Sequence, residues 1–359
     1  MPPVINVKFD QHDHRVYCSG ETLSGRVEVS CTKATLIRSI SIQVLGFAKT
    51  FWDRTIVCSC KLNCIKRDHS TYYDHSGREE YMSKHIYLLG SPDATPVEFC
   101  SGLHKYEFSF DLSPTLPSSF EGTCGYIRYL AKVAIDRPNT SILTTVEKFA
   151  IINAFDLNKD SPVLKLRADV ETVYEPGCLC CSSKPFQLKA SVPQTGLIAG
   201  QIIPVRTEIN NASNLDVRDV RFYLRKIITY YSNKRKRKSS KTDIVELVSV
   251  SCAYMVRKGC NKFEEFLAVP KTQSSTKDMN LGLIQISYDI KVEVVLHMWR
   301  KNPFVVLPIT IGTVALKDVV QNEVTFDKNS KNYGADELEP LNGKAFGDNE
   351  DVYIEFIDE

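Results

Sequence analysis

The run Ile284-Gln-Ile-Ser-Tyr-Asp-Ile-Lys-Val-Glu-Val-Val-Leu296 alternates apolar and polar side chains almost throughout. Alternation with a period of two is typical of a β-strand whose two faces meet different environments. The face that carries Ile284, Tyr288 and Val292 is apolar, and a second sheet must cover it to keep it from water. This run therefore predicts a strand in the core of a β-sandwich.

The same alternation recurs along much of the chain. It is clear from Tyr106 to Leu112 and from Ile127 to Ile135. Shorter strands fit the segments Val27 to Cys31, Ile40 to Val44, Val205 to Ile209 and Val220 to Leu224. No run has convincing helical spacing. Repeated short strands without helices, in a chain of 359 residues, predict an all-β protein built from two antiparallel sandwiches.

The composition is that of an ordinary globular protein, with 43% hydrophobic and 25% charged residues. The formal net charge is +2, so no global field attracts the chain to nucleic acid. The first residues lack the apolar stretch of a signal sequence, and the apolar run at residues 304–316 is too short to span a membrane. We therefore expect a cytoplasmic protein whose 12 Cys are reduced thiols.

An internal repeat supports two domains. Cys18-Ser-Gly-Glu-Thr-Leu-Ser-Gly-Arg-Val-Glu-Val29 has a counterpart in Ile198-Ala-Gly-Gln-Ile-Ile-Pro-Val-Arg-Thr-Glu-Ile209, and each is a glycine turn followed by an alternating strand. Residues 335–359 hold nine acids and one base, which predicts a disordered tail. We predict an N-terminal sandwich at residues 1–160, an inter-domain crossing at 161–184, a C-terminal sandwich at 185–320 and an acidic tail at 321–359.

Several segments resemble the arrestin superfamily, and specifically its arrestin domain-containing, or α-arrestin, branch. They are Val16-Tyr-Cys-Ser-Gly-Glu-Thr-Leu-Ser-Gly-Arg-Val27, Leu116-Pro-Ser-Ser-Phe-Glu-Gly122, Gly125-Tyr-Ile-Arg-Tyr-Leu-Ala-Lys132, Val192-Pro-Gln-Thr-Gly-Leu-Ile-Ala-Gly-Gln201, Ile209-Asn-Asn-Ala-Ser213 and Leu307-Pro-Ile-Thr-Ile-Gly-Thr-Val314. The resemblance implies two arrestin-type, immunoglobulin-like β-sandwich domains. It also implies a non-enzymatic adaptor that binds cytoplasmic tails of membrane receptors or transporters and couples them to endocytic sorting and protein transport. Such an adaptor is cytoplasmic and is recruited to the plasma membrane or endosomes.

One linear motif that is common in α-arrestins is missing. Many of these proteins carry Pro-Pro-x-Tyr in the C-terminal tail, where it docks in the aromatic groove of the WW domains of ubiquitin ligases. The only Pro-Pro pair in this chain is Pro2-Pro3, and Val4 and Ile5 follow it. This argues against direct recruitment of a ligase by that route, so a link to ubiquitination needs another contact or partner.

The strongest local charge feature is a run of five cations between two strand-like segments, Lys234-Arg235-Lys236-Arg237-Lys238. At a hairpin tip these side chains would meet anionic lipid headgroups or phosphorylated tails and give the protein a peripheral membrane contact. A solvated loop without a ligand explains the run equally well, and a nuclear import signal is a third interpretation.

Two further bases, Arg128 and Lys132, lie four residues apart and therefore on the same side of one predicted strand. In arrestins a basic N-domain surface receives phosphorylated or acidic segments, so by resemblance this pair contributes to such a surface. Ordinary exposed bases on a solvated sheet face are the alternative.

The tail segment Asp351-Val-Tyr-Ile-Glu-Phe-Ile357 is β-prone and flanked by acids. Its apolar residues Val352, Tyr353, Ile354 and Phe356 suit strand addition at an exposed sheet edge, with the carboxylates facing bases. This predicts a latch onto the N-terminal domain, as in the tails of some arrestins. A plain disordered tail remains the alternative.

Two groups of Cys resemble metal sites. Cys58, Cys60 and Cys64, with His69 and His75, offer zinc ligands. The three Cys share one face of a predicted strand with Ile56 and Leu62, which favours small buried side chains. The trio Cys178, Cys180 and Cys181 is interpreted as unmodified thiols, with acylation or metal binding as alternatives. We predict no metal and no cofactor.

Motifs of common enzymes are missing from the sequence. It has no Gly-x-Ser-x-Gly, no Gly-x-x-x-x-Gly-Lys and no His-Glu-x-x-His, and His12-Asp-His14 is only a weak cluster. No catalytic residue is therefore predicted. The alternative function is a non-catalytic scaffold that binds soluble signalling partners or retromer-like partners, with binding indifferent to phosphate and salt.

Overall fold

The computed structural model describes residues 2–10, 15–62, 65–174, 184–213, 216–233, 239–252, 258–276, 282–296 and 301–317. For residues 54–74 it describes the backbone pairing only. Apart from two short 3₁₀ turns, the regular structure within these ranges is β-strand. This confirms the all-β fold class. Within these ranges, no helix is long and apolar enough to cross a membrane.

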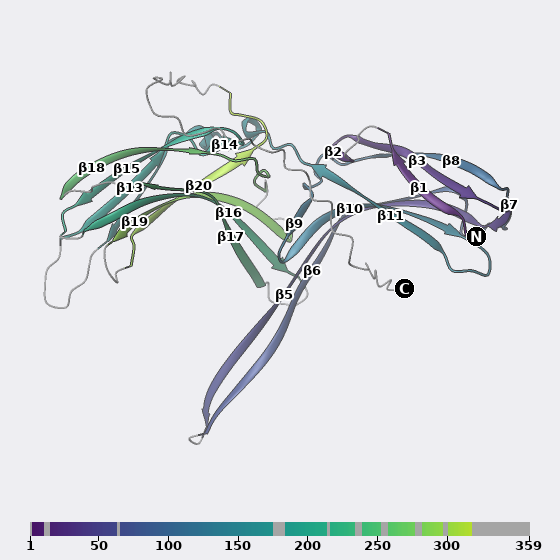
Figure 1. The fold of residues 1–359 in the computed structure, drawn as a ribbon, viewed down its shortest axis with the longest axis horizontal. Coiled ribbons are helices and arrows are strands. Elements are labelled where there is room, and N and C mark those ends of the chain that lie inside the picture. The colour runs from purple at the N-terminus through teal and green to yellow at the C-terminus, as the bar shows by residue number, and fades with distance from the viewer. Residues whose placement is uncertain are drawn as a thin grey trace. The chain divides into compact units, whose positions relative to one another are not determined.

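The first half of the chain forms a sandwich (Figure 1). One sheet has the order β1-β3-β8, and the other has the order β2-β11-β10-β5-β6, with β9 paired to β10. A small third sheet joins β4 and β7. The strands are β1 Val4–Phe9, β2 Val16–Cys18, β3 Thr22–Cys31, β4 Thr35–Ile37, β5 Ser39–Leu62, β6 Ile65–Gly90, β7 Val97–Phe99, β8 Gly102–Asp111, β9 Phe120–Gly122, β10 Gly125–Asp136 and β11 Leu143–Ile152.

The second half forms a second sandwich, with sheets in the orders β12-β13-β15-β18 and β14-β20-β19-β16-β17. Two 3₁₀ turns, η1 Leu157–Lys159 and η2 Pro162–Lys165, precede it. Its strands are β12 Ala168–Tyr174, β13 Phe186–Val192, β14 Gly196–Ile198, β15 Ile202–Asn211, β16 Val217–Ser232, β17 Ser239–Cys252, β18 Gly259–Ala268, β19 Ile284–Leu296 and β20 Phe304–Gly312.

The period-two pattern places the core. In β10 the odd-numbered side chains from Ile127 to Ile135 are buried, and in β19 the even-numbered ones from Ile284 to Leu296 are buried. Each Val, Leu or Ile removed from water in this way contributes about 1.5–3 kcal/mol. β19 has the same bounds as the run quoted first, which confirms it as a core strand.

The internal repeat is visible in the backbone. Gly20 and Gly200 adopt φ values of +90° and +86°, a conformation that glycine reaches without strain. Each lies in a turn before a ten-residue strand, β3 or β15. The short strand before each turn pairs in parallel with a strand of the opposite sheet: β2 with β11, and β14 with β20. The chain therefore changes sheet at the same point in both sandwiches.

The segment 161–184 is more regular than its sequence suggested. η2 and β12 lie within it, and β12 pairs with β13 over seven residues, from Ala168 opposite Val192 to Tyr174 opposite Phe186. β12 therefore belongs to a sheet of the second sandwich. The sequence predicts only a crossing here, although Ala168 to Tyr174 carries a short alternation. The four domain boundaries remain a prediction.

Side chains and backbone of the two sandwiches make direct contact. Asn233, just after β16, donates from Nδ2 to the Arg78 carbonyl oxygen (2.9 Å) and accepts from the Arg78 amide through Oδ1 (3.2 Å). Nearby, Ser232 donates to the Ser76 carbonyl oxygen (2.7 Å), and Thr50 donates to the Tyr231 carbonyl oxygen (2.6 Å). The bonds to Ser76 and Arg78 satisfy backbone groups of the edge strand β6, and the bond from Thr50 satisfies a carbonyl of β16.

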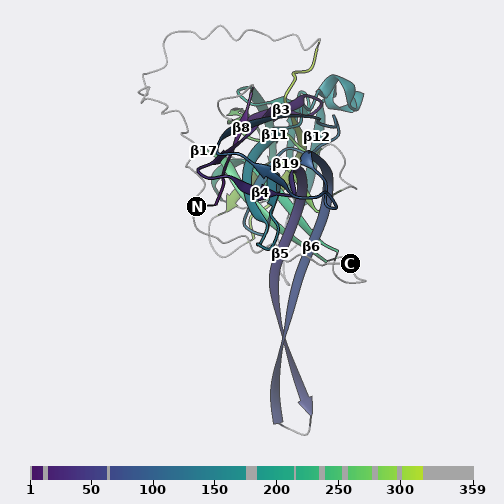
Figure 2. The ribbon, with the colours of Figure 1, turned by 90° about the vertical axis from the view of Figure 1, so that its right-hand side faces the viewer.

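β5 and β6 form the longest hairpin in the described residues. β10 pairs with β5 only as far as Thr50, and the two strands of the hairpin continue beyond that point as a ribbon (Figures 1 and 2). In Figure 2 the ribbon shows the crossing of its strands that twist produces. The predicted strand face with Cys58 and Cys60 falls in this ribbon, where side chains are not described.

Candidate functional site

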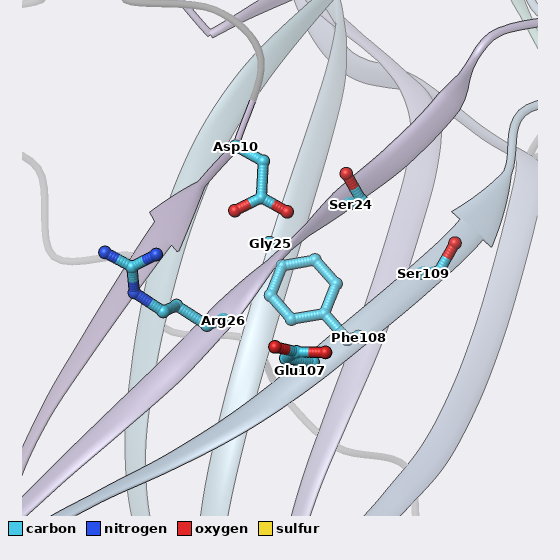
Figure 3. A pocket seen from close by; sticks show the side chains of 7 residues that line it. All are labelled: Asp10, Ser24, Gly25, Arg26, Glu107, Phe108 and Ser109. Carbon is cyan, nitrogen blue, oxygen red and sulfur yellow. The ribbon is translucent and has the colours of Figure 1, made fainter.

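A depression of about 320 Å³ lies on the sheet β1-β3-β8 (Figure 3). Three charged side chains line it, together with the Phe108 ring and two hydroxyls, and the set is Asp10, Ser24, Gly25, Arg26, Glu107, Phe108 and Ser109. Gly25 is required here because a Cβ would clash with the Lys8 carbonyl oxygen and lie 2.8 Å from Cζ of Phe108. The depression suits a small polar group rather than an apolar one.

The cations beside this depression already have a counter-ion. Glu28 lies between Lys8 (Nζ to Oε2, 2.9 Å) and Arg26 (Nε to Oε1, 3.0 Å), and its side chain is largely buried. The hydrogen bond from Lys8, and to a smaller extent the one from Arg26, lowers the pKa of the Glu28 carboxyl. Because the carboxylate is held in its charged form, an anion that binds Lys8 or Arg26 shares that cation with Glu28.

Arg128 lies on the polar side of β10, as predicted, but its guanidinium is already engaged. It donates from Nε and Nη2 to both carboxylate oxygens of Glu121 on β9 (2.7 and 3.0 Å). The guanidinium carbon also lies 3.7 Å from the centroid of the Tyr126 ring. Such a bidentate, stacked arrangement fixes the side chain, so this Arg is a positioned cation with an acidic partner.

Lys132 follows on the same side of β10, two residues beyond Leu130. Burial lowers the pKa of the Lys132 ammonium. Leu130 is only 5% exposed although it points away from the core between the sheets. The long side chains around it therefore cover apolar surface with their stems while their charged ends reach water.

The outward side of β5 and β6 adds residues that the sequence did not single out. Phe47 packs edge-on against Tyr126, with ring centroids 6.1 Å apart, and the Arg78 guanidinium lies 5.3 Å from the Phe47 ring. Lys49 pairs across the strands with both Tyr126 and Arg78. We define the outer N-face as the outward side of β5, β6, β10 and β11. It runs from the residues that pair across the strands with Lys49 to those that pair across the strands with Lys132.

Other predicted site residues lie outside the described residues. These are the basic run Lys234, Arg235, Lys236, Arg237 and Lys238, the tail residues Val352, Tyr353, Ile354 and Phe356, and the trio Cys178, Cys180 and Cys181. β16 and β17 flank the basic run, which confirms its place at a hairpin connection. The outcome of the zinc interpretation is likewise not decided, because the side chains of Cys58, Cys60 and His69 are not described. Among the side chains that are described, no three His, Cys, Asp or Glu gather as metal ligands.

Comparisons with known proteins place this geometry in a family. The model of the arrestin (or S-antigen) N-terminal domain matches residues 5–158, and that of the C-terminal domain matches residues 182–316. Arrestin domain-containing protein 4 is 25% identical over 215 residues in Mus musculus and 26% identical over 216 residues in Homo sapiens. In both cases the match covers 58% of this chain and 49% of the relative, so the chain spans about half the length of these relatives.

Thioredoxin-interacting protein of Pongo abelii is 24% identical over 302 residues, which is 83% of this chain and 72% of the relative. Arrestins are generally non-catalytic adaptors. With a domain match on each sandwich and the strand plan described above, the chain belongs to the arrestin family and is a distant relative of the α-arrestins.

Proposed function

We propose that this protein is an adaptor that binds cytoplasmic segments of membrane proteins and couples them to endocytic sorting and protein transport. The observation that carries the proposal is the pair of arrestin domain matches, one on each sandwich and together covering most of the chain. In this function the chain makes and breaks no covalent bond. It acts in the cytoplasm and is recruited to the plasma membrane or endosomes.

The cargo contact that we propose is a basic surface for acidic or phosphorylated segments, with Arg128, Lys132 and the run 234–238 as its cations. Arg128 is held by Glu121, so an incoming carboxylate or phosphate competes with that residue. A phosphoryl group carries nearly two negative charges and three acceptor oxygens, against one charge and two oxygens on Glu121, which favours a phosphorylated competitor.

The acidic tail is a further part of the proposal. Residues 351–357 latch onto the N-terminal domain in the resting state, and cargo displaces them. Limited proteolysis tests this: a variant in which Arg128 and Lys132 are both Gln should be cut faster within residues 335–359 than the natural chain. Equal cleavage rates would contradict the latch.

Proximity labelling in cells tests the adaptor function. The intact chain is compared with a version that ends at Tyr333 and with one in which the five bases of the run 234–238 are Gln. The proposal expects receptors, transporters and endosomal coat components among the labelled proteins. It also expects weaker labelling after neutralisation and stronger labelling after tail removal.

A second candidate is a non-catalytic scaffold for a non-membrane protein. The similarity over 83% of the chain to thioredoxin-interacting protein, a relative named for a protein partner, favours it. In that case labelling should enrich partners without membrane segments, and neither change in the chain should alter the set. That result would replace the trafficking proposal.

A further inference from the structure

The outward sheet faces of this protein differ in how their charges are compensated. On β1-β3-β8, Glu28 bonds both Lys8 and Arg26. On β12-β13-β15-β18, the ion pairs are Arg206–Glu264 (2.7 Å), Lys262–Glu208 (3.5 Å) and Arg167–Asp169 (2.9 Å). On β14-β20-β19-β16-β17, Arg225 pairs with Asp289 (2.7 Å) and Lys291 pairs with Glu293 (3.3 Å). Each of these faces balances its cations with carboxylates of its own.

The outer N-face has an excess of positive charge. Strand register places five cations on it, against two carboxylates, Glu80 and Glu121: the cations are Lys49, Arg78, Arg128, Lys132 and Lys148. Five minus two leaves a charge of +3 on a chain whose formal total is only +2. The excess ends at Asp53, which follows Phe51 on the outward side of β5.

These cations are spread in two dimensions. Lys148 lies on β11, Arg128 and Lys132 on β10, Lys49 on β5 and Arg78 on β6, which are successive strands of one sheet. Neighbouring strands lie about 4.8 Å apart and same-face residues about 6.8 Å apart along a strand, so the array covers roughly 14 Å across the strands and roughly 20 Å along them. A single extended peptide follows one line and meets only part of such an array.

Exposed apolar side chains lie among the cations. On β11, Val146 and Ile152 are 42% and 46% exposed on the same side as Lys148, and Phe51, which borders the face two residues beyond Lys49 on β5, is 47% exposed. Phe47 and Tyr126 add aromatic rings beneath Arg78 and Arg128. Apolar and aromatic groups interspersed with Lys and Arg are typical of protein surfaces at the boundary of a bilayer.

We propose that the outer N-face docks on an anionic bilayer. Its dispersed cations meet headgroups, which form a two-dimensional array of negative charge, and Phe51, Val146 and Ile152 enter the headgroup region. This surface is separate from the run 234–238. It shares Arg128 and Lys132 with the proposed cargo contact, whereas Lys49, Arg78 and Lys148 belong to the bilayer contact alone.

Vesicle flotation with the full chain tests the proposal. The vesicles contain phosphatidylcholine with 30% phosphatidylserine, or phosphatidylcholine alone. Each cation near such a surface strengthens binding about five-fold, so K49Q/K148Q should weaken binding to the anionic vesicles by roughly 25-fold. The matched control is K105Q/K262Q, which removes two exposed cations from other sheet faces and should leave binding nearly unchanged.

A second variant keeps the charge constant. V146S/I152S should weaken binding to the anionic vesicles several-fold through the lost apolar contact, with circular dichroism and the melting temperature showing that it is folded. Failure of the full chain to float with anionic vesicles would overturn the proposal. Equal loss in K49Q/K148Q and in the control would do the same, because it indicates a nonspecific charge effect. Tight binding of soluble poly-glutamate without vesicle binding would show that the face receives an acidic peptide instead.

Discussion

The ion pair between Arg225 and Asp289 should be the most costly one in the described residues to break from one side. Arg225 donates from Nε and Nη2 to the two carboxylate oxygens, each at 2.7 Å, and the two side chains are only 16% and 7% exposed. Asp289→Asn removes the negative charge with little change in volume and leaves the guanidinium buried without a counter-ion. We expect a loss of about 3–5 kcal/mol in the free energy of opening of this sheet, the range for breaking a buried pair.

Hydrogen exchange followed by mass spectrometry measures the opening free energy of each sheet locally, with peptides from β16 and β19 for Asp289→Asn and from β15 and β18 for the control, which suits a protein with two sandwiches. Glu264→Gln is the control, because it breaks the Arg206–Glu264 pair, also 2.7 Å long but 62% and 41% exposed. It should cost about 0–1 kcal/mol. The double variant R225M/D289L should recover most of the loss, since an apolar pair replaces two charges. Equal, small losses in Asp289→Asn and Glu264→Gln would refute the assignment of this difference to burial.

Two further predictions follow from single contacts. Asn233→Ala removes both bonds to the Arg78 backbone, so the Arg78 amide should exchange faster and its opening free energy should fall by about 1–2 kcal/mol, whereas Ser249→Ala on β17 should leave it unchanged. Burial raises the pKa of Tyr288 to about 12, so the folded state keeps the phenol neutral while the unfolded chain ionises near pH 10. The stability that this group contributes is complete below pH 10 and is lost as the pH rises toward 12. In urea unfolding, the free energy of unfolding of Tyr288→Phe should therefore fall less steeply with pH than that of the natural chain across that window. An unchanged slope would contradict the assignment.

The fold was predictable wherever one side of a strand alternated cleanly. β10 and β19 follow directly from alternation, because the core face admits only apolar residues at every second position. β12 was overlooked because none of its side chains is buried, so its pattern of charged and apolar residues is weak. Its strand character comes from pairing with β13, which lies across the undescribed segment 175–183.

The candidate site was predictable only in its local part. Arg128 and Lys132 share a strand, so their spacing was sufficient to place them on one side. The partners of Arg128 depend on longer-range pairing: Glu121 comes from the β9 side of a turn, and Phe47 comes from a strand some 80 residues earlier. Pairing register across strands, and not spacing along one strand, decides which cations gather on the outer N-face.

The near-zero net charge was a poor guide to docking for the same reason. A total of +2 excludes attraction by the whole protein but is silent on single faces. Where a carboxylate lies directly across from a cation, as Glu264 does from Arg206 and Glu208 from Lys262, the two cancel within one strand spacing. On the outer N-face the cross-strand neighbours of Lys49 are Tyr126 and Arg78, so the positive charges of Lys49 and Arg78 add. Reversing Lys49 to Glu would therefore weaken membrane docking far more than the same reversal of Lys262, although both change the net charge equally.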